Sequence, residues 1–215
     1  MSKLAGLTLE NDIQEAADNL GGFSLFDSNA YLMKLEAAYL GTADSGAKSL
    51  NIIAKSSDNR EFRQTFWMTS GTAKGGKHYY ERDGVKHYLP GFQMASDLAL
   101  LTAGKELSEL DVEERVIKIF NKDLKKNAPT PVDMLVDLVG QEVYLGIVKQ
   151  TVDKTEKTDA GYVNTGEVRV INDVVKIFRA DDMLTVAEVR SGGADTPFFH
   201  NWVERFKDTV QNKAK

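Results

Sequence analysis

The chain has 215 residues, of which 42% are hydrophobic, 27% are charged and none is cysteine. This size and composition fit one soluble domain with modest additions and a sizeable core. A sequence without cysteine excludes disulfides, thiol catalysis, zinc ribbons and iron–sulfur clusters. The three histidines, His78, His87 and His200, lack the spacing of a metal-binding motif, so we expect no metal and no cofactor.

The amino-terminal residues, MSKLAGLTLENDIQEA, are acidic and lack the basic and apolar regions of a secretory signal. No run approaches the 18 consecutive apolar residues of a membrane span. We therefore expect an intracellular protein of a reducing compartment that has no contact with membranes.

The net charge of -5 is unevenly distributed. Residues 1–45 hold two basic and seven acidic residues, whereas residues 46–90 hold eight basic and four acidic ones. The basic segment also carries six aromatic residues, namely Phe62, Phe66, Trp67, Tyr79, Tyr80 and Tyr88. Such interleaving suits a single nucleic-acid strand, whose phosphates attract cations and whose bases stack on rings. Composition alone equally allows a core of aromatics beneath a solvated charged surface.

The first half of the chain reads mainly as strands. Residues 8–20 predict a short helix or arm that stops at Gly21-Gly22. Three strands are then predicted at 31–40, 47–55 and 61–70. After a glycine-rich connection, Asp83-Gly84 signals a hairpin turn.

The second half begins with a helical period from Pro90-Gly91. Residues 105–126 are charged and periodic, although VIKIF within them fits a strand equally well, and VDMLVDLVG predicts a short helix ended by Gly140. Strands are predicted again at 141–151 and 167–178. A short helix from Thr185 through Arg190 follows. The last helix begins at Pro197, with an apolar stripe of Phe198, Trp202, Val203 and Phe206 that we expect to pack on the sheet.

Three strands, a mostly helical connection and two strands match the five-stranded Greek-key barrel of the OB-fold. We therefore predict a mainly β protein with α additions. It would comprise an acidic arm or helix at 1–29, an OB-fold domain at 30–180 with a helical insertion at about 91–140, and a helical extension at 181–215.

In an OB-fold the ligand crosses strands two and three, beside the loops that join strands one–two and four–five. Alternation in the third strand predicts that Phe62, Gln64, Phe66 and Met68 face the core, and that Arg63, Thr65, Trp67 and Thr69 face the ligand. In the second strand, Leu50 and Ile52 would face inward, which leaves Asn51 and Lys55 on the ligand side. Near the four–five loop, Lys154 and Lys157 are candidate ligand residues, and Tyr162 fits either a ligand contact or a cap on the barrel.

Residues 71–77, GTAKGGK, match the first seven positions of a P-loop, but His78 replaces the required Ser or Thr, and a hairpin rather than a helix follows. We therefore expect Lys74 and Lys77 to meet a nucleic-acid backbone in a flexible loop. Paired acids such as Glu113-Glu114 read as solvated surface, and no Gly-x-Ser-x-Gly elbow occurs. The sequence thus predicts no enzyme.

The run WMTSGTAKGGKHYYERDGVKHYLPGF, with SDLALLTAGKELSEL, LVGQEVYLGIVK and TGEVRVINDVVKIF, resembles the OB-fold single-stranded DNA-binding proteins of tailed bacteriophages. The resemblance spans roughly residues 30–180 and is closest to the siphophage type, with a distant likeness to the replication proteins of short-tailed phages. It implies sequence-independent coating of single-stranded DNA during phage replication, recombination and repair, in the cytoplasm of the infected host. It also implies that DNA is contacted by Trp67, Lys74, Lys77, Tyr79, Tyr80, Arg82 and Lys86.

Such proteins usually end in an acidic tail that recruits replication partners, whereas this chain ends in KDTVQNKAK. Recruitment of phage or host replication proteins is therefore left open, as is the oligomeric state. RNA is an alternative ligand, since nothing in the sequence reads the 2′-hydroxyl. A protein-interaction module remains a further alternative, based on the acidic first 45 residues and the aromatic last helix.

Overall fold

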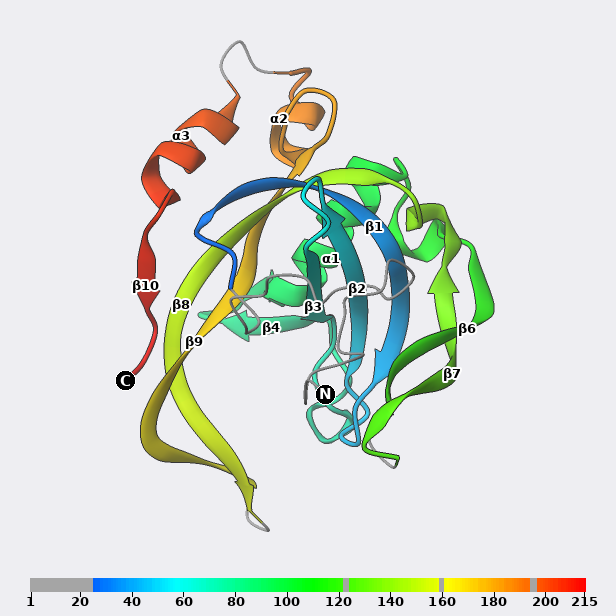
Figure 1. The fold of residues 1–215 in the computed structure, drawn as a ribbon, viewed down its shortest axis with the longest axis vertical. Helices are drawn as coiled ribbons and strands as arrows, with labels where there is room; N and C mark the ends of the chain where they lie inside the picture. The colour runs from blue at the N-terminus through cyan, green and yellow to red at the C-terminus, as the bar shows by residue number, and fades with distance from the viewer. Residues whose placement is uncertain (1–24, 122–123, 159–160, 194–196) are drawn as a thin grey trace, which may run out of the picture.

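The computed structural model describes residues 25–121, 124–158, 161–193 and 197–215. Within these ranges the protein is mainly β, with three α-helices, which confirms the predicted class. Figure 1 shows long curved strands that wrap around helix α1, a hairpin at one side, a two-stranded ribbon that projects from the body, and two small helices at the opposite end from the ribbon tip. The predicted helix at 8–20 lies outside the described residues.

The first three strands form an antiparallel meander: β1 (Asn29–Thr42), β2 (Lys48–Ser56) and β3 (Glu61–Trp67). All three were predicted, since each run is apolar and bounded by turn residues. Their register sets Leu50 opposite Phe66 and Asn51 opposite Thr65, so alternate rows face the core and the outside.

The remaining long strands are β8 (Glu142–Thr158) and β9 (Gly161–Arg179), and the short strand β10 (Val210–Asn212) lies parallel to β8. β8 pairs with β1 at one end and with β9 along its length. Between β3 and β9 no strand pairing occurs among the described residues, so the sheet is not closed. Gln64 Nε2 spans this gap by donating to Asp173 Oδ1 at 2.9 Å.

The core lies inside the curved sheet and is covered at the open edge by α1 (Pro90–Thr102). The fully buried side chains from the strands include Met33, Leu35, Leu50, Ile52, Leu145, Ile147 and Ile177. From α1, Ala95, Leu98 and Ala99 pack against them. This helix therefore fills the space that strand pairing leaves open.

The predicted helical insertion at about 91–140 is wrong beyond α1. After the 3-10 turn η2 (Leu107–Glu109), the chain forms the hairpin of β6 (Val112–Asn121) and β7 (Lys126–Leu135), and only the 3-10 turn η3 (Val136–Leu138) follows. The predicted helix in VDMLVDLVG is thus wrong, because its first four residues end β7 and the next three form η3. The hairpin forms because its alternate residues Ile117, Ile119, Val132 and Met134 pack on Ala37 and Ile53, on the outer side of β1 and β2. Alternation with period two prevails there over a weak helical period.

The polar stretch expected to connect the last two strands is itself strand over residues 152–158 and 161–166, and it forms the distal half of the β8–β9 ribbon. The predicted hairpin at Asp83-Gly84 is confirmed between β4 (Tyr79–Arg82) and β5 (Val85–Tyr88). Asp83 and Gly84 have φ values of 53° and 75°, as a two-residue turn with left-handed backbone requires.

The carboxy-terminal helices are α2 (Val186–Arg190), with the predicted Thr185 cap, and α3 (Phe198–Phe206). Trp202 is buried against Val148 and Phe178, as expected, but Phe199 joins this cluster whereas the predicted Phe198 is exposed. A Cβ at Gly146 would lie 2.9 Å from the Trp202 ring, so a glycine on β8 admits the indole. In the described part of the chain no helix is long and apolar enough to cross a membrane.

Candidate nucleic-acid interface

The outer side of β3 has the predicted alternation. Phe62 and Phe66 are buried in the core, whereas Arg63, Thr65 and Trp67 face outward. The Trp67 side chain is 49% exposed, which is unusual for an indole and leaves its ring accessible for stacking. Arg63, on the same side of the strand, forms an ion pair from Nε to Glu61 Oε1 at 2.6 Å.

The outer side of β2 is less open than predicted. Asn51 is half-buried, because its Oδ1 accepts a hydrogen bond from Thr65 Oγ1 at 2.8 Å and its Nδ2 donates to Ser49 Oγ at 3.3 Å. Lys55 Nζ lies 3.1 Å from Glu36 Oε1 of β1. Ile53, between them, is buried beneath the β6–β7 hairpin. Asn51 and Lys55 therefore lie on the predicted side of the sheet but are engaged within the protein.

The GTAKGGK segment folds into the 3-10 turn η1 (Thr72–Lys74), which leads into strand β4 and not into a helix. Its position is set by the β1–β2 turn, since the Thr72 amide donates to the Ser45 carbonyl oxygen at 2.8 Å. The Lys77 amide donates to Ser70 Oγ at 3.0 Å. Hydrogen bonds at Thr72 and Lys77 thus fix the loop that the sequence predicted to be flexible. The side chains of Lys74 and Lys77 are exposed on it.

The β4–β5 hairpin brings cations and rings together. Lys86 Nζ lies 5.0 Å and Lys77 Nζ 5.6 Å from the centroid of the half-buried Tyr79 ring. Tyr80 stacks on His87, with ring centroids 5.4 Å apart and an interplanar angle of 26°. Of the predicted residues, Tyr79, Tyr80 and Lys86 therefore lie on one small sheet, and Lys77 precedes its first strand.

Tyr88 and His87 are interface candidates that the sequence prediction omitted. Tyr88 pairs with Tyr79 across the hairpin and packs on Phe92 of α1, at 5.1 Å between centroids, while remaining exposed. The hairpin signal could have identified both residues, because a two-residue turn at Asp83-Gly84 places 87 opposite 80 and 88 opposite 79.

A groove follows the unpaired seam between β3 and β9, and we call it the seam groove. One hollow of about 430 Å³ is lined by Thr65 and Trp67 of β3, Met94 of α1 and Asp173 of β9. A second, of about 600 Å³, shares Met94 and Asp173 with the first. Its outer wall is formed by Tyr80, Lys86, His87 and Tyr88. The outer side of β3 and the β4–β5 hairpin therefore border one continuous surface.

Asp173 is the acidic residue that both hollows share. Burial raises the pKa of its carboxyl group, an effect that the hydrogen bond from Gln64 and the charge of Lys213 only partly offset. Burial thus favours the protonated form of this carboxyl group more than solvent would.

The remaining predicted residues lie elsewhere. Arg82 is highly exposed at the tip of the β4–β5 hairpin, 3.5 Å from Asp83. On the β8–β9 ribbon, Lys154 forms an ion pair with Glu167, and Lys157 lies opposite Tyr162, which is 74% exposed. That exposure is incompatible with Tyr162 acting as a cap on the barrel. The distal part of the ribbon, which carries these residues, contributes nothing to the lining of the seam groove within the described residues.

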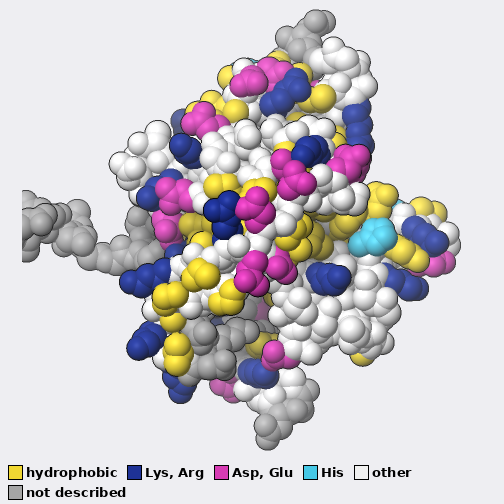
Figure 2. All heavy atoms as spheres, turned by 90° about the vertical axis from the view of Figure 1, so that its right-hand side faces the viewer, with side chains coloured by type: hydrophobic (Ala, Val, Ile, Leu, Met, Phe, Trp, Pro, Cys, Tyr) yellow, Lys and Arg dark blue, Asp and Glu magenta, His cyan; other side chains and the backbone are white. Residues whose placement is uncertain are grey.

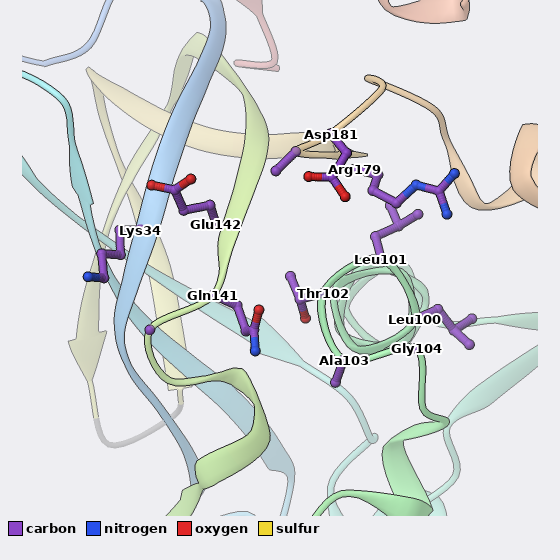
Figure 3. A pocket seen from close by; sticks show the side chains of 12 residues that line it. Lys34, Leu100, Leu101, Thr102, Ala103, Gly104, Gln141, Glu142, Arg179 and Asp181 are labelled. Atoms are coloured by element: carbon purple, nitrogen blue, oxygen red, sulfur yellow. The ribbon is translucent and has the colours of Figure 1, made fainter.

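A further hollow, of about 630 Å³, lies at the carboxy-terminal end of α1 (Figure 3). Its lining mixes Lys34, Glu142, Arg179 and Asp181 from separate elements. Arg179 is already paired with Asp182, and this guanidinium lowers the pKa of the Asp182 carboxyl group. No group of three potential metal ligands occurs among the described residues. The chemistry of this hollow therefore points to no particular ligand.

Comparison with models of known protein families gives no match, and comparison with curated protein sequences gives none either.

Proposed function

We propose that the protein binds single-stranded nucleic acid, principally DNA, without sequence preference, along β3 and the seam groove. The observation that carries this proposal is the grouping of exposed rings around one groove, with Trp67 on one side and Tyr80 and Tyr88 on the other. Lys74, Lys77 and Lys86 lie on the adjoining turn and hairpin. The non-enzymatic role and the phage replication setting implied by the sequence resemblance belong to the same proposal.

The proposed fold is an OB-type barrel left open at one seam. Its five strands are β1, β2, β3, β8 and β9, with α1 between the third and the fourth as in that architecture. The β6–β7 hairpin is an addition on the outer side of β1 and β2. An OB-type ligand path across strands two and three would here be displaced towards β3, because this hairpin covers Ile53.

In the proposed complex, aromatic and basic side chains make different contributions to binding. Each base stacked on an aromatic ring contributes about 1–3 kcal/mol whatever its identity. Lysine and arginine would neutralise phosphates and release counterions, so that affinity falls as salt concentration rises. Rings and cations read neither base edges nor the 2′-hydroxyl, which supports sequence-independent binding and keeps RNA as an alternative ligand.

The chain contains two tryptophans, and the variant Trp202→Phe leaves Trp67 as the only indole reporter. We expect the Trp67 fluorescence of this variant to be quenched saturably by oligo-dT, and the affinity to fall between low and high salt. Oligo-U in place of oligo-dT separates a DNA from an RNA preference. Absence of quenching at low salt, together with no shift of a labelled oligonucleotide in a gel, would overturn the proposal.

A further inference from the structure

Strand β6 has a free edge. It pairs with β7 over all ten of its residues, and within the described ranges it pairs with no other strand. It contains neither proline nor glycine. A long unprotected edge of this kind is a template for pairing with another strand, and proteins usually protect such edges.

The other edge of the same hairpin is protected. β7 carries Pro129 and Pro131, which lie opposite Lys118 and Val116 of β6. Proline has no N–H, so both residues occupy positions whose nitrogen points away from β6, towards the far edge of β7. The two prolines therefore prevent pairing along the middle of the β7 edge, which among the described residues pairs with β1 only at Met134, opposite Tyr39. The β6 edge has no such protection.

The side of β6 that faces away from the sheet is largely apolar. Val116 is 66% and Phe120 59% exposed, and Val112 is exposed on the same side. Glu114 and Lys118 alternate with them along the strand. Figure 2, which views the molecule from the side where β6 and β7 lie in Figure 1, shows hydrophobic side chains exposed there among acidic and basic ones.

The side chains of β6 that face away from the sheet are complementary to those of a second β6 strand running antiparallel to it. An antiparallel pair of β6 strands centred on Val116 sets Val116 against Val116 and Val112 against Phe120. The same register sets Glu114 of each copy against Lys118 of the other, so both charge pairs are favourable. A shift by two residues in either direction separates the charges, and a shift by one turns the apolar side of one strand to the opposite face.

The isolated hairpin leaves these charges uncompensated. Glu114 lies directly opposite Asp133 in the β6–β7 ladder, and two like charges in that position destabilise a strand pair. Among the described residues, the side chains of Glu114 and Lys118 form no hydrogen bond or ion pair. A second copy in the register above would supply a lysine next to this acidic pair.

We propose that two copies of this chain associate through their β6 edges, antiparallel and two-fold symmetric about Val116, in a continuous β7–β6–β6–β7 sheet. Such an interface is isologous and therefore closes as a dimer. A dimer would join two nucleic-acid surfaces, and the second contact with one long strand would gain from a raised effective concentration. The association itself does not depend on the proposed binding function.

Sedimentation equilibrium of the full chain tests the dimer. We expect a concentration-dependent shift from 23.8 kDa towards twice that mass. Glu114→Lys and Lys118→Glu should each remain monomeric, because each places like charges against one another in both pairs. An equimolar mixture of the two single variants should dimerise again, since every basic position of one variant then faces an acidic position of the other.

Glu204→Lys on α3 is the matched control, because it makes the same charge change at an exposed site far from β6 in sequence and should leave the dimer intact. Unchanged thermal unfolding of the single variants would establish that they fold. A wild-type chain that is monomeric at every soluble concentration would overturn the proposal. Failure of the mixed variants to reassociate would overturn it as well, and both readouts are obtained without nucleic acid.

Discussion

The backbone of Trp67 and the α-carbon of Gly91 are in direct contact. A Cβ at position 91 would lie 2.2 Å from the Trp67 carbonyl oxygen, closer than any real side chain can approach. The first turn of α1 thus rests on the end of β3, at the residue whose indole borders the seam groove. One glycine therefore couples the position of the helix to that of the proposed stacking ring.

We expect Gly91→Ala to lower the free energy of unfolding by about 1–3 kcal/mol, the range for an added methyl group in a packed site. Because the clash is with backbone, relief requires a shift of α1 or of the β3 end, and affinity for oligo-dT should also fall. Urea unfolding and fluorescence titration measure the two effects. Ser96→Ala in the same helix is the control, and equal behaviour of the two variants would contradict the close contact.

The two tryptophans should respond oppositely to truncation. Trp67→Ala should weaken binding of single-stranded DNA roughly tenfold, within the about 1–3 kcal/mol of one stacked base, with an unchanged melting temperature. Trp202→Ala should cost about 3–5 kcal/mol of stability, because it empties the cluster of Val148 and Phe178.

Electrophoretic shift of a labelled oligonucleotide and thermal unfolding of both variants distinguish these effects. If Trp67→Ala unfolded the protein instead, the indole would be part of the core and the assignment of the outer face of β3 would fail.

Much of the sheet was predictable because its strands alternate regularly or are bounded by clear turns. The inward Phe62 and Phe66 and the outward Trp67 follow from period two alone. The β6–β7 hairpin was not predictable in the same way. VDML fits a helix and a strand alike, and only the neighbouring surface of Ala37 and Ile53 decides between them.

The proposed interface was predictable in its parts but not in their arrangement. Strand alternation indicated Trp67, and the sequence resemblance indicated Tyr80 and Lys86. The seam groove that they border, however, depends on the missing β3–β9 pairing, a long-range property. Strand alternation correctly predicted that Asn51 lies on the outer side of β2, but its hydrogen bond from Thr65 cannot be predicted from the sequence. The alternation along a strand predicts which face of the sheet a side chain lies on. Tertiary packing decides whether that side chain is free to bind a ligand.

The cations near η1 should control the salt dependence of binding. The double variant Lys74→Gln/Lys77→Gln should reduce the slope of log affinity against log salt by about 0.7 for each phosphate contact that is lost. Titration of oligo-dT at four salt concentrations measures this slope. Lys154→Gln/Lys157→Gln on the ribbon removes the same charge at a place without described contact to the seam groove and should change the slope less. Equal slopes for the two variants would contradict a DNA path beside η1.

Replacing the ionisable side chain of Asp97 on α1 should raise the stability of the protein, by an amount that depends on pH. Burial raises the pKa of its carboxyl group, against the hydrogen bond from Gln93 and the charges of Lys176 and Arg190. Between the usual aspartate pKa and this raised pKa, the folded chain therefore holds a proton that the unfolded chain has released. Stability falls as the pH rises through that window, and the full cost persists above it. Below the usual aspartate pKa both states are protonated and this cost is absent.

Asp97→Asn keeps an acceptor for the Gln93 amide, which donates at 2.7 Å, and cannot ionise. We expect it to raise the free energy of unfolding at neutral pH by up to about 1 kcal/mol, and this gain should shrink as the pH falls towards about 4. Urea unfolding over that range measures the difference. Asp44→Asn, at an exposed turn, is the control and should give no such trend. A gain that is constant with pH would mean that the substitution acts through packing and not through the buried charge.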